Sequence, residues 1–397
     1  MTLAGRRVVL GVSGGIACYK ACTIARRLAE SGAAVDVVLT ASAQEFVRPV
    51  TFEALSGRPV LTSLWERGRA LSHIDLPHGA DLVILAPATA NLVARLAHGL
   101  ADDLLTTIML ANEAPVLIAP AMNDRMYAHP ATQANLAMLH ERGWLVIGPD
   151  VGPLAEGPSE RPGRMVEPEE IMLHAERLIR SAESKLNGKR VVVTAGPTRE
   201  YLDPVRVVTN PSSGRMGYAV AEAAFVRGAD VILISGPTAL GVPAGVRTDW
   251  VETTAEMKES VERSVGRADL LVMAAAPADF RPRERRGDKV PRSGGGLSVD
   301  LEPTEDILAS TVRRRAKGAL AVGFALESGA GMDSAREKLR RKKLDLIVLN
   351  SATDPEGGFE SETNRATLVT ERDAEELGVL PKREVAERIL DRVEAMM

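Results

Sequence analysis

The stretch KRVVVTAGPTREYLDPVRVVTNPSSGRMG, residues 189–217, decides how the second half of the chain folds. Its apolar β-branched run, Val191 to Val193, is bounded by Lys189-Arg190 and Gly196-Pro197, which is typical of a buried parallel strand. At its other end, Ser212-Ser213-Gly214 precede an amphipathic run that predicts a helix, and a helix start attracts phosphate. Roughly a dozen and a half residues separate strand and helix, where a simple nucleotide fold needs a short turn. The excess indicates a substrate-binding loop or, alternatively, a long surface loop.

The opening of this stretch, GKRVVVTAGPT, has a counterpart near the start of the chain, GRRVVLGVSGG at residues 5–15. In each half, strand patterns alternate with helical patterns, which predicts an α/β fold with two doubly wound, mostly parallel-sheet (Rossmann-like) domains. A charged, helix-prone segment at 167–187 ends at Asn187-Gly188, so we expect domains at 1–187 and 188–397. The expected strands are 6–12, 35–39, 81–86, 115–119 and 145–147, then 191–194, 230–235, 269–274, 320–325 and 344–349. The expected helices are 16–31, 90–98 and 122–142, then 214–228, 253–265, 305–316, 332–343 and 382–396.

Composition excludes several classes of partner. The 397 residues are 45% hydrophobic but only 3% aromatic, with a net charge of −4. A surface of this kind gives no reason to expect nucleic acid or an anionic membrane. No apolar run reaches the roughly 20 residues of a membrane span, and the N-terminus runs straight into a strand pattern rather than a signal peptide. Cys18 and Cys22 are expected to be small core thiols in a reducing cytoplasm.

Glycine turns follow the first strand of each half, but they give little support for a dinucleotide-binding site. Dinucleotide folds usually place an acidic residue, or an arginine for the phosphorylated cofactor, after strand two. The sequence has Leu39-Thr40-Ala41 and Ile234-Ser235-Gly236 there. Neither half contains G-x-G-x-x-G.

Four short stretches of the first half lie at strand ends or in adjacent loops. They are Ser72–Asp75, Pro87–Asn91, Pro120–Asn123 and Gly163–Met165. Ligands of open α/β sheets bind at the carboxyl ends of the strands, so these stretches predict a site. Taken singly, His73 is compatible with an ordinary loop histidine and Asn123 with a helix N-cap.

Taken together, these stretches resemble the flavin-dependent cysteine decarboxylases, whose hallmarks include the PAMN sequence found at 120–123. The second half resembles the ligase that accompanies that enzyme. Nearly the whole chain is thus similar to the bifunctional phosphopantothenoylcysteine decarboxylases/phosphopantothenate–cysteine ligases of coenzyme A synthesis. The resemblance implies FMN in the first half, trimers or higher oligomers of that half, and dimers of the second.

The resemblance also implies site residues for the decarboxylase. Oxidation of the cysteine CH2–SH provides the electron sink that decarboxylation of an acylated cysteine lacks, and the flavin performs that oxidation. His73 would be the catalytic histidine, and Asn123 would hold the substrate carboxylate. The FMN site would comprise Ser13, Gly14, Thr40, Pro87, Thr89 and Asn91, and the substrate contacts would be Met122 and Arg164.

One position departs from the family pattern. The flap reads Ala155-Glu156-Gly157 where well-known members have a cysteine that protonates the enethiolate. For Glu156 to replace that cysteine, burial under the closed flap must favour its protonated form. The alternative is a solvent-facing Glu156 and a proton taken from water.

For the second half, the resemblance implies CTP, Mg2+, 4'-phosphopantothenate and L-cysteine. The catalytic residues would be Asn210, on the acyl-cytidylate, and Lys289, in the basic loop 281–296. The other contacts would be Ser212, Ser213, Gly214, Ala274, Ala275, Ala276, Asp279, Asp306, Phe324, Lys338 and Lys342. Alternatively, Lys338 and Lys342 form a solvated helix face and 281–292 a linker. The sequence assigns no metal ligands.

Three functions stay open at this point. The first is the full bifunctional enzyme. The second is an active ligase whose first domain binds FMN and forms oligomers but decarboxylates poorly, as Glu156 suggests. The third is a regulatory flavoprotein that inhibits a phosphatase, which the complete ligase set from Asn210 to Lys342 disfavours.

Overall fold

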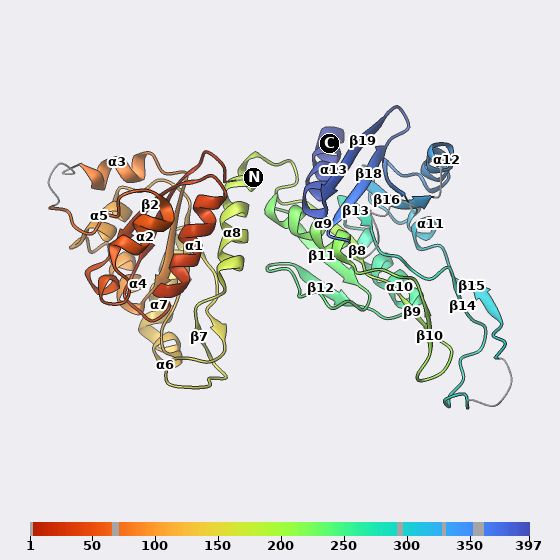
Figure 1. The fold of residues 1–397 in the computed structure, drawn as a ribbon, viewed down its shortest axis with the longest axis horizontal. Coiled ribbons are helices and arrows are strands. Elements are labelled where there is room, and N and C mark those ends of the chain that lie inside the picture. The colour runs from red at the N-terminus through yellow and green to blue at the C-terminus, as the bar shows by residue number, and fades with distance from the viewer. Residues whose placement is uncertain (1–2, 66–70, 292–296, 328–330, 352–360) are drawn as a thin grey trace. The chain divides into compact units, whose positions relative to one another are not determined.

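The computed structural model describes residues 3–65, 71–291, 297–327, 331–351 and 361–397 (Figure 1). It divides into two compact units, Met1–Arg180 and Ser181–Met397. None of the helices in these ranges is long and apolar enough to cross a membrane.

The first unit is built on one parallel sheet with the strand order β2-β1-β3-β4-β5. Each strand is a short apolar run, as expected for strands covered on both faces. The order reverses direction between β1 and β3, which is the doubly wound arrangement that the sequence predicts. The strands are β1 (Arg7–Val12), β2 (Ala34–Leu39), β3 (Leu82–Ala88), β4 (Val116–Pro120) and β5 (Leu145–Val146).

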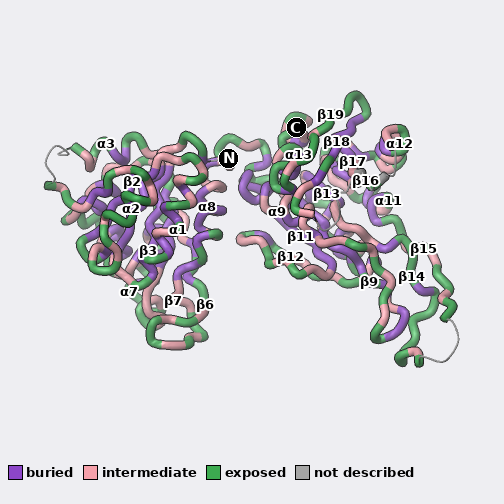
Figure 2. Tube along the Cα trace, viewed as in Figure 1, coloured by how far each residue is buried: buried purple, intermediate pink, exposed green. Residues whose placement is uncertain are grey.

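Helices cover both faces of this sheet, so its strands are buried (Figure 2). One face packs against α1 (Cys18–Glu30), α2 (Pro49–Ser56) and α8 (Pro168–Arg180). The other face packs against α4 (Ala90–Ala97), α5 (Leu104–Leu110) and α7 (Pro130–Glu141).

The second unit contains an eight-stranded sheet with the order β12-β11-β8-β13-β16-β17-β18-β19. The strands from β12 to β17 are parallel, and β18 and β19 are added antiparallel at one edge. The parallel part has the strand order of dinucleotide-binding folds, with its reversal between β8 and β13. Its strands are β8 (Arg190–Ala195), β11 (Asp230–Ser235), β12 (Arg247–Trp250), β13 (Leu270–Met273), β16 (Leu320–Glu327), β17 (Leu346–Ser351), β18 (Thr363–Val369) and β19 (Ala374–Pro381).

Helices again cover this sheet. One face packs against α10 (Thr254–Val265), α11 (Ile307–Thr311) and α12 (Met332–Lys342). Elsewhere, α9 (Arg215–Val226) packs on β8 and β11, and α13 (Lys382–Met396) packs on α9. Fully buried Arg227, just after α9, joins the two helices by an ion pair with Glu387 of 2.9 Å.

The predicted class, with its two mostly parallel doubly wound sheets, is confirmed. The expected helix 122–142 is two helices, α6 (Asp124–Ala128) and α7, because Pro130 starts a new helix rather than continuing one. Strands β12, β18 and β19 of the large sheet and the helices α2, α3 (Ser72–His78) and α5 were not predicted. The division between units falls seven residues before 188, since Leu186 is fully buried and Lys185 bonds Glu394 O of α13 at 2.9 Å.

The basic loop 281–296 begins within a small antiparallel pair, β14 (Phe280–Pro282) with β15 (Leu301–Pro303). Residues 292–296 of that loop lie outside the described residues. The described residues on the two sides of this stretch include the paired strands β14 and β15.

Candidate active sites

Ser13 connects the carboxyl ends of β1 and β3. Its buried Oγ donates to Pro87 O at 2.7 Å and accepts from Thr89 N at 2.9 Å. These strands flank the reversal of the sheet, which is where open α/β sheets bind ligands. The structure therefore brings Ser13, Pro87 and Thr89 together at the predicted position.

The turn after β1 presents bare backbone on one side. A Cβ at Gly14 would lie 2.4 Å from Ser42 Cβ, so only glycine fits against that loop. A Cβ at Gly15 would meet nothing closer than Thr89 Cγ2 at 3.7 Å, which leaves space over this residue. A planar ring or a phosphate can approach such a turn closely, so the residues present fit FMN.

Two threonines begin the segments that border this turn. Thr40 Oγ1 accepts from Ala43 N at 3.2 Å and starts the short 3-10 helix η1 (Ala41–Glu45). Thr89 Oγ1 accepts from Leu92 N at 3.3 Å and starts α4, which places exposed Asn91 in its first turn. The remaining N–H groups of these helix starts favour an anion such as the FMN phosphate.

Asn123 presents a defined donor. Its Oδ1 caps α6, accepting from Arg125 N at 2.9 Å and Met126 N at 3.4 Å. The amide nitrogen therefore points to other acceptors, and it donates to the carboxylate of Glu156. A carboxylate is thus an accepted ligand of this side chain.

Glu156 lies at the tip of a flap formed by residues 150–164. Strands β6 (Asp150–Val151) and β7 (Pro162–Arg164) pair antiparallel, and Leu154 and Gly157 exchange backbone hydrogen bonds of 2.8 and 3.1 Å at the tip. Met122 N donates to Gly163 O at 3.0 Å, so the flap is joined to the loop that carries Asn123. Glu156 itself is exposed rather than buried under the flap.

Arg164, at the end of the flap, pairs with Glu167 and not with Glu156. Glu167 also pairs with buried Lys20 of α1 at 3.1 Å. Among the described residues, no ion pair therefore joins Arg164 to Glu156, a contact that would have favoured the ionised form of that carboxylate.

His73 does not lie beside Asn123 and Glu156 in this structure. It lies on α3, whose Asp75 O accepts from Arg7 Nη1 at 3.5 Å, and Arg7 begins β1. Asn123 instead follows the carboxyl end of β4. Within the described ranges, no hydrogen bond or ion pair joins His73 to Asn123 or Glu156.

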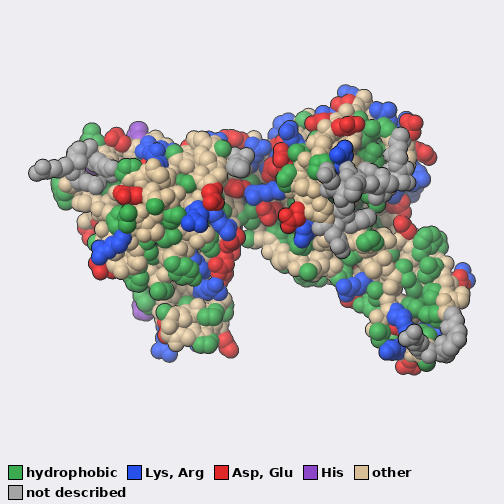
Figure 3. Space-filling view, in the orientation of Figure 1, with side chains coloured by type: hydrophobic (Ala, Val, Ile, Leu, Met, Phe, Trp, Pro, Cys, Tyr) green, Lys and Arg blue, Asp and Glu red, His purple; other side chains and the backbone are tan. Residues whose placement is uncertain are grey.

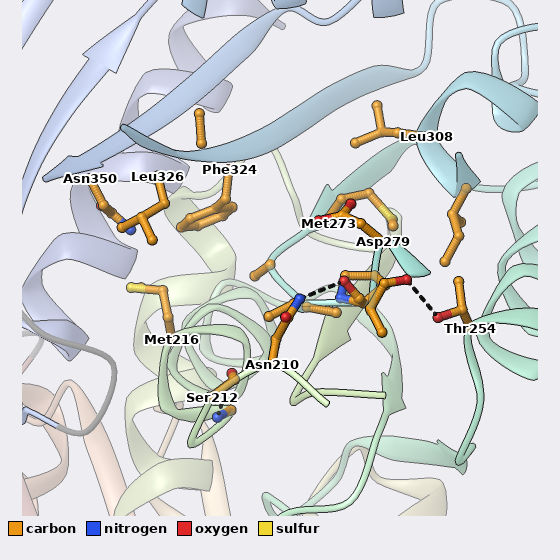
Figure 4. A pocket seen from close by; sticks show the side chains of 18 of the residues that line it. Asn210, Ser212, Met216, Thr254, Met273, Asp279, Leu308, Phe324, Leu326 and Asn350 are labelled. Atoms are coloured by element: carbon orange, nitrogen blue, oxygen red, sulfur yellow. Dashed lines mark hydrogen bonds between the residues drawn. The ribbon is translucent and has the colours of Figure 1, made fainter. Parts of the chain in front are cut away.

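The second unit contains a cavity of about 610 Å³ beside the reversal of its sheet (Figure 4). All but one of the expected ligase residues line it. They are Asn210, Ser212, Ser213, Gly214, Ala274, Ala275, Ala276, Asp279, Asp306, Phe324, Lys338 and Lys342.

Close backbone approaches shape this cavity. Gly214, before α9, has a φ of +76°, and a Cβ there would lie 2.7 Å from Thr238 Cγ2. A Cβ at Gly217 would lie 2.6 Å from Ala195 Cβ. Because glycine has no Cβ, α9 can start against the end of β8. Asn210 Nδ2 donates to Pro277 O at 2.9 Å, which fixes the amide at the cavity wall.

An ion pair closes one part of the wall. Lys342 Nζ lies 2.8 Å from Asp306 Oδ2, and Asp306 also caps α11. Partial burial opposes ionisation of Asp306, but Lys342 and the Ala309 N–H outweigh it, so the pKa of this carboxyl is below its ordinary value. Lys338 Nζ donates to Phe324 O at 3.2 Å. Neither lysine belongs to a purely solvated helix face.

Lys289 is the exception among the expected ligase residues. It is exposed and does not line the cavity. Its neighbour Val290 donates from N to Asp203 Oδ2 at 3.1 Å, and Asp203 is fully buried. Burial opposes ionisation of Asp203, but backbone N–H groups, those of Val205 and Val290 first, outweigh it and lower its pKa to about 2.

Several lining residues were missed from the sequence. Asn350, Asn364 and Lys382 reach the cavity from β17, β18 and the start of α13. Asn364 Nδ2 donates to Asn350 Oδ1 at 3.1 Å. These residues could have been found if β18 and β19 had been predicted, because β18 carries Asn364 and Lys382 directly follows β19. Arg215 was also missed, although it directly follows the predicted Ser212-Ser213-Gly214.

Known proteins share this order of the two domains along the chain. A family model described as the DNA/pantothenate metabolism flavoprotein C-terminal domain matches residues 186–397, and one described as flavoprotein matches residues 1–179. The coenzyme A biosynthesis bifunctional protein CoaBC of Vibrio cholerae is 44% identical over 400 residues, covering 100% of each chain. The chain belongs to this family.

A second member, CoaBC of Mycobacterium tuberculosis, is 46% identical over 378 residues, covering 92% of this chain and 90% of its own. Among solved structures, the FMN-dependent cysteine decarboxylase SpaF is 33% identical with a TM-score of 0.39. That match covers 45% of this chain and 99% of SpaF.

Proposed function

We propose that the chain catalyses two consecutive steps of coenzyme A biosynthesis. The second unit ligates 4'-phosphopantothenate to L-cysteine with CTP, and the first unit decarboxylates the product to 4'-phosphopantetheine with FMN. Full-length membership of the bifunctional family supports both steps and does not favour a ligase with an impaired first domain. The cavity that gathers Asn210 through Lys342 is the observation that carries the ligase assignment.

In the first unit, we assign the FMN site to the turn at Ser13-Gly14 and to the starts of η1 and α4. When bound, FMN supplies the two-electron chemistry that turns the cysteine side chain into an electron sink. Ser13 holds the ends of β1 and β3 together, while the capped helix starts at Thr40 and Thr89 offer N–H groups to an anion.

Asn123 then binds the substrate carboxylate through Nδ2, since its Oδ1 is used as a helix cap. The flap over this loop carries Arg164 and Glu156 and excludes water when it closes on substrate. Glu156 would replace the proton donor of the family once the substrate covers it.

In the second unit, a carboxylate oxygen of phosphopantothenate attacks the α-phosphorus of CTP, which forms an acyl-cytidylate and releases pyrophosphate. The cysteine amine then attacks the acyl carbon and releases CMP. Asn210 lines the cavity and would donate to the acyl oxygen as negative charge develops there. Lys289 would reach the site by movement of its exposed loop.

Mg2+ is proposed to enter with CTP. No group of three or more His, Cys, Asp or Glu side chains that could hold a metal ion is found within the described part of the chain. Mg2+ is usually bound by substrate phosphates and one or two carboxylates, for which Asp279 in the cavity is a candidate.

Oligomers of the first unit are also proposed, with a trimer as the smallest. Support comes from the separation of His73 and Asn123 and from exposed apolar side chains, some visible in Figure 3. These include Ile16 at 65% exposure, Tyr19 at 61% and Trp65 at 89%. Dimers of the second unit and a cytoplasmic location remain predictions.

The decisive experiment incubates the purified chain with 4'-phosphopantothenate, cysteine and CTP, and follows the products by mass. Successive appearance of phosphopantothenoylcysteine and 4'-phosphopantetheine is expected. Accumulation of the first compound alone would instead support the ligase with an impaired decarboxylase, and neither compound would contradict the whole proposal.

A further inference from the structure

The ligase cavity has one end at which positive charge gathers. Lys382 lines the cavity and is only 9% exposed, and Arg215 lines it at the first residue of α9. Burial, and secondarily the nearby charge of Arg215, lowers the pKa of the Lys382 amine. Two cations and the N-terminus of a twelve-residue helix therefore meet at this end.

The rest of the cavity is closer to neutral. Lys342 pairs with Asp306 at 2.8 Å, and the other charged lining residues of this part are Lys338, Asp279 and Glu305. By contrast, the carboxylate beside Arg215 is Glu362, which is 90% exposed and 3.6 Å away. Coulomb attraction thus favours an anion at the Arg215 end over the Lys342 end.

The antiparallel edge of the sheet places Lys382 there. Thr363 of β18 pairs with Pro381 of β19, and Lys382 N donates to Glu362 O at 3.0 Å. The backbone is therefore held on both sides of the position where α13 begins. Figure 4 shows Asn350, Leu326 and Phe324 along one side of the cavity, facing Met216 and Ser212 at the start of α9.

We propose that Lys382, with Arg215 and the N-terminus of α9, forms a phosphate subsite that holds the β- and γ-phosphates of CTP and the pyrophosphate leaving group. This assignment rests on the proposed ligase function. Lys382 would stabilise the charge that accumulates on pyrophosphate as the bond from the α-phosphorus to the bridging oxygen breaks.

The test compares two neighbouring residues in the full chain. Lys382→Met removes the buried charge and keeps a chain of similar length, whereas Arg383→Met removes an exposed charge that pairs with Glu222. For Lys382→Met, the KM for CTP and the inhibition constant for added pyrophosphate should both rise by about 10- to 100-fold, as for a lost hydrogen bond to a charged group. Arg383→Met should leave both unchanged, and Lys382→Arg should restore most of the affinity.

Two controls separate the possible failures. Decarboxylation of supplied phosphopantothenoylcysteine by the same preparations reports an intact first unit. If the unmodified chain makes neither phosphopantothenoylcysteine nor 4'-phosphopantetheine, the proposed function fails. If it makes either, and Lys382→Met retains the original KM for CTP and the original pyrophosphate inhibition, only the subsite is overturned. A rise confined to the KM for 4'-phosphopantothenate also overturns the assignment, since that substrate carries the other phosphate.

A measurement on the unmodified chain covers the case in which Lys382→Met does not fold. Pyridoxal 5'-phosphate followed by borohydride labels accessible lysines with lowered pKa, and peptide mapping locates them. Labelling of Lys382 that pyrophosphate suppresses is expected. Labelling that pyrophosphate leaves unchanged, or no labelling of Lys382, would contradict the proposal.

Discussion

The side-chain amide of Asn123 donates a hydrogen bond to the carboxylate of Glu156, joining the loop after β4 to the tip of the flap. Asn123 is also the residue proposed to bind the substrate carboxylate. The amide nitrogen carries two hydrogens, so the substrate carboxylate can either share this donor with Glu156 or displace it. In either case, Glu156 stays at the tip of the flap beside the residue proposed to bind the substrate carboxylate, where the proposed mechanism requires a proton donor.

Glu156→Gln should still release CO2 from phosphopantothenoylcysteine but should stall at the enethiol, because an amide does not replace a carboxylic acid as proton donor. Mass spectrometry should find a product two hydrogens lighter than 4'-phosphopantetheine. Glu160→Gln, an exposed change on the same flap, is the matched control and should give the normal product. Formation of 4'-phosphopantetheine by Glu156→Gln at the parent rate would remove Glu156 from the proton transfer.

The purified chain should be yellow and contain about one FMN per chain. The Gly14→Ala variant should lose most of the bound FMN. The added Cβ would lie 2.4 Å from Ser42 Cβ and 2.5 Å from the Ser42 backbone carbon, so the turn must move. Absorbance of the released flavin against protein concentration measures the stoichiometry. Gly241→Ala, where a Cβ meets nothing within 4 Å, should keep it. A colourless parent that takes up no FMN on titration would refute the flavin assignment.

Asn210→Asp should lower ligase turnover by about 10²-fold or more, the usual loss for a donor to a developing oxyanion. The change replaces the amide that donates to Pro277 O with a carboxylate and places an anion near the acyl oxygen. Decarboxylase activity of the same preparation serves as the internal control. Unchanged ligase turnover would exclude Asn210 from the mechanism.

Lys289→Gln should lower kcat more than it raises the KM for CTP. Lys289 lies outside the cavity lining in this structure, so it can act only after its loop has closed over bound substrates. Steady-state kinetics with varied CTP make the distinction. Arg283→Gln, on the same exposed segment and paired with Asp300, is the control. A change in KM alone would make this loop a binding feature.

Asp203→Asn should reduce the acid sensitivity of the second unit. The pKa of Asp203 is lowered from 3.8 to about 2, so the folded state binds its proton less readily than the unfolded state. Its stabilising effect is therefore complete above about pH 3.8 and is lost as the pH falls toward 2. At pH 7 the melting temperature of the variant should be several degrees below that of the parent, and this difference should shrink as the pH falls from about 3.8 to about 2. Parallel melting curves at all pH values would contradict the assigned pKa.

Most of the parallel strands could be predicted because burial on both faces leaves a direct trace in sequence, as at Val191–Val193. The parallel edge strand β12 was missed, because its four residues are exposed or half-buried and form no apolar run. The same argument does not reach β19, whose residues are mostly exposed and whose pairing with β18 involves no intervening helix. The helix expected over 122–142 could have been divided correctly at Pro130, because proline favours the first turn of a new helix.

Candidate site residues could be predicted where the sheet itself places them. Ser13 and Thr89 follow strands of the first parallel sheet, and the carboxyl ends of parallel strands share one edge. Asn210 instead follows β10 (Val207–Thr209), which pairs antiparallel with β9 (Arg199–Tyr201), so its place in the cavity does not follow from the parallel sheet. Lys382 could not be found in this way, because it reaches the cavity only when α13 packs on α9. The location of His73 near the amino end of β1 likewise depends on tertiary packing of α3.

The lining of the ligase cavity extends from Asn210 to Lys382, and α13 is the last helix of the chain. Synthesis on the ribosome proceeds from the N-terminus, so the first unit is complete once Arg180 has emerged. The cavity, in contrast, lacks part of its wall until Lys382 has emerged. A nascent chain can therefore complete the residues of the proposed flavin site well before those of the ligase cavity, and a chain truncated before Lys382 is expected to keep the first set and lose part of the second.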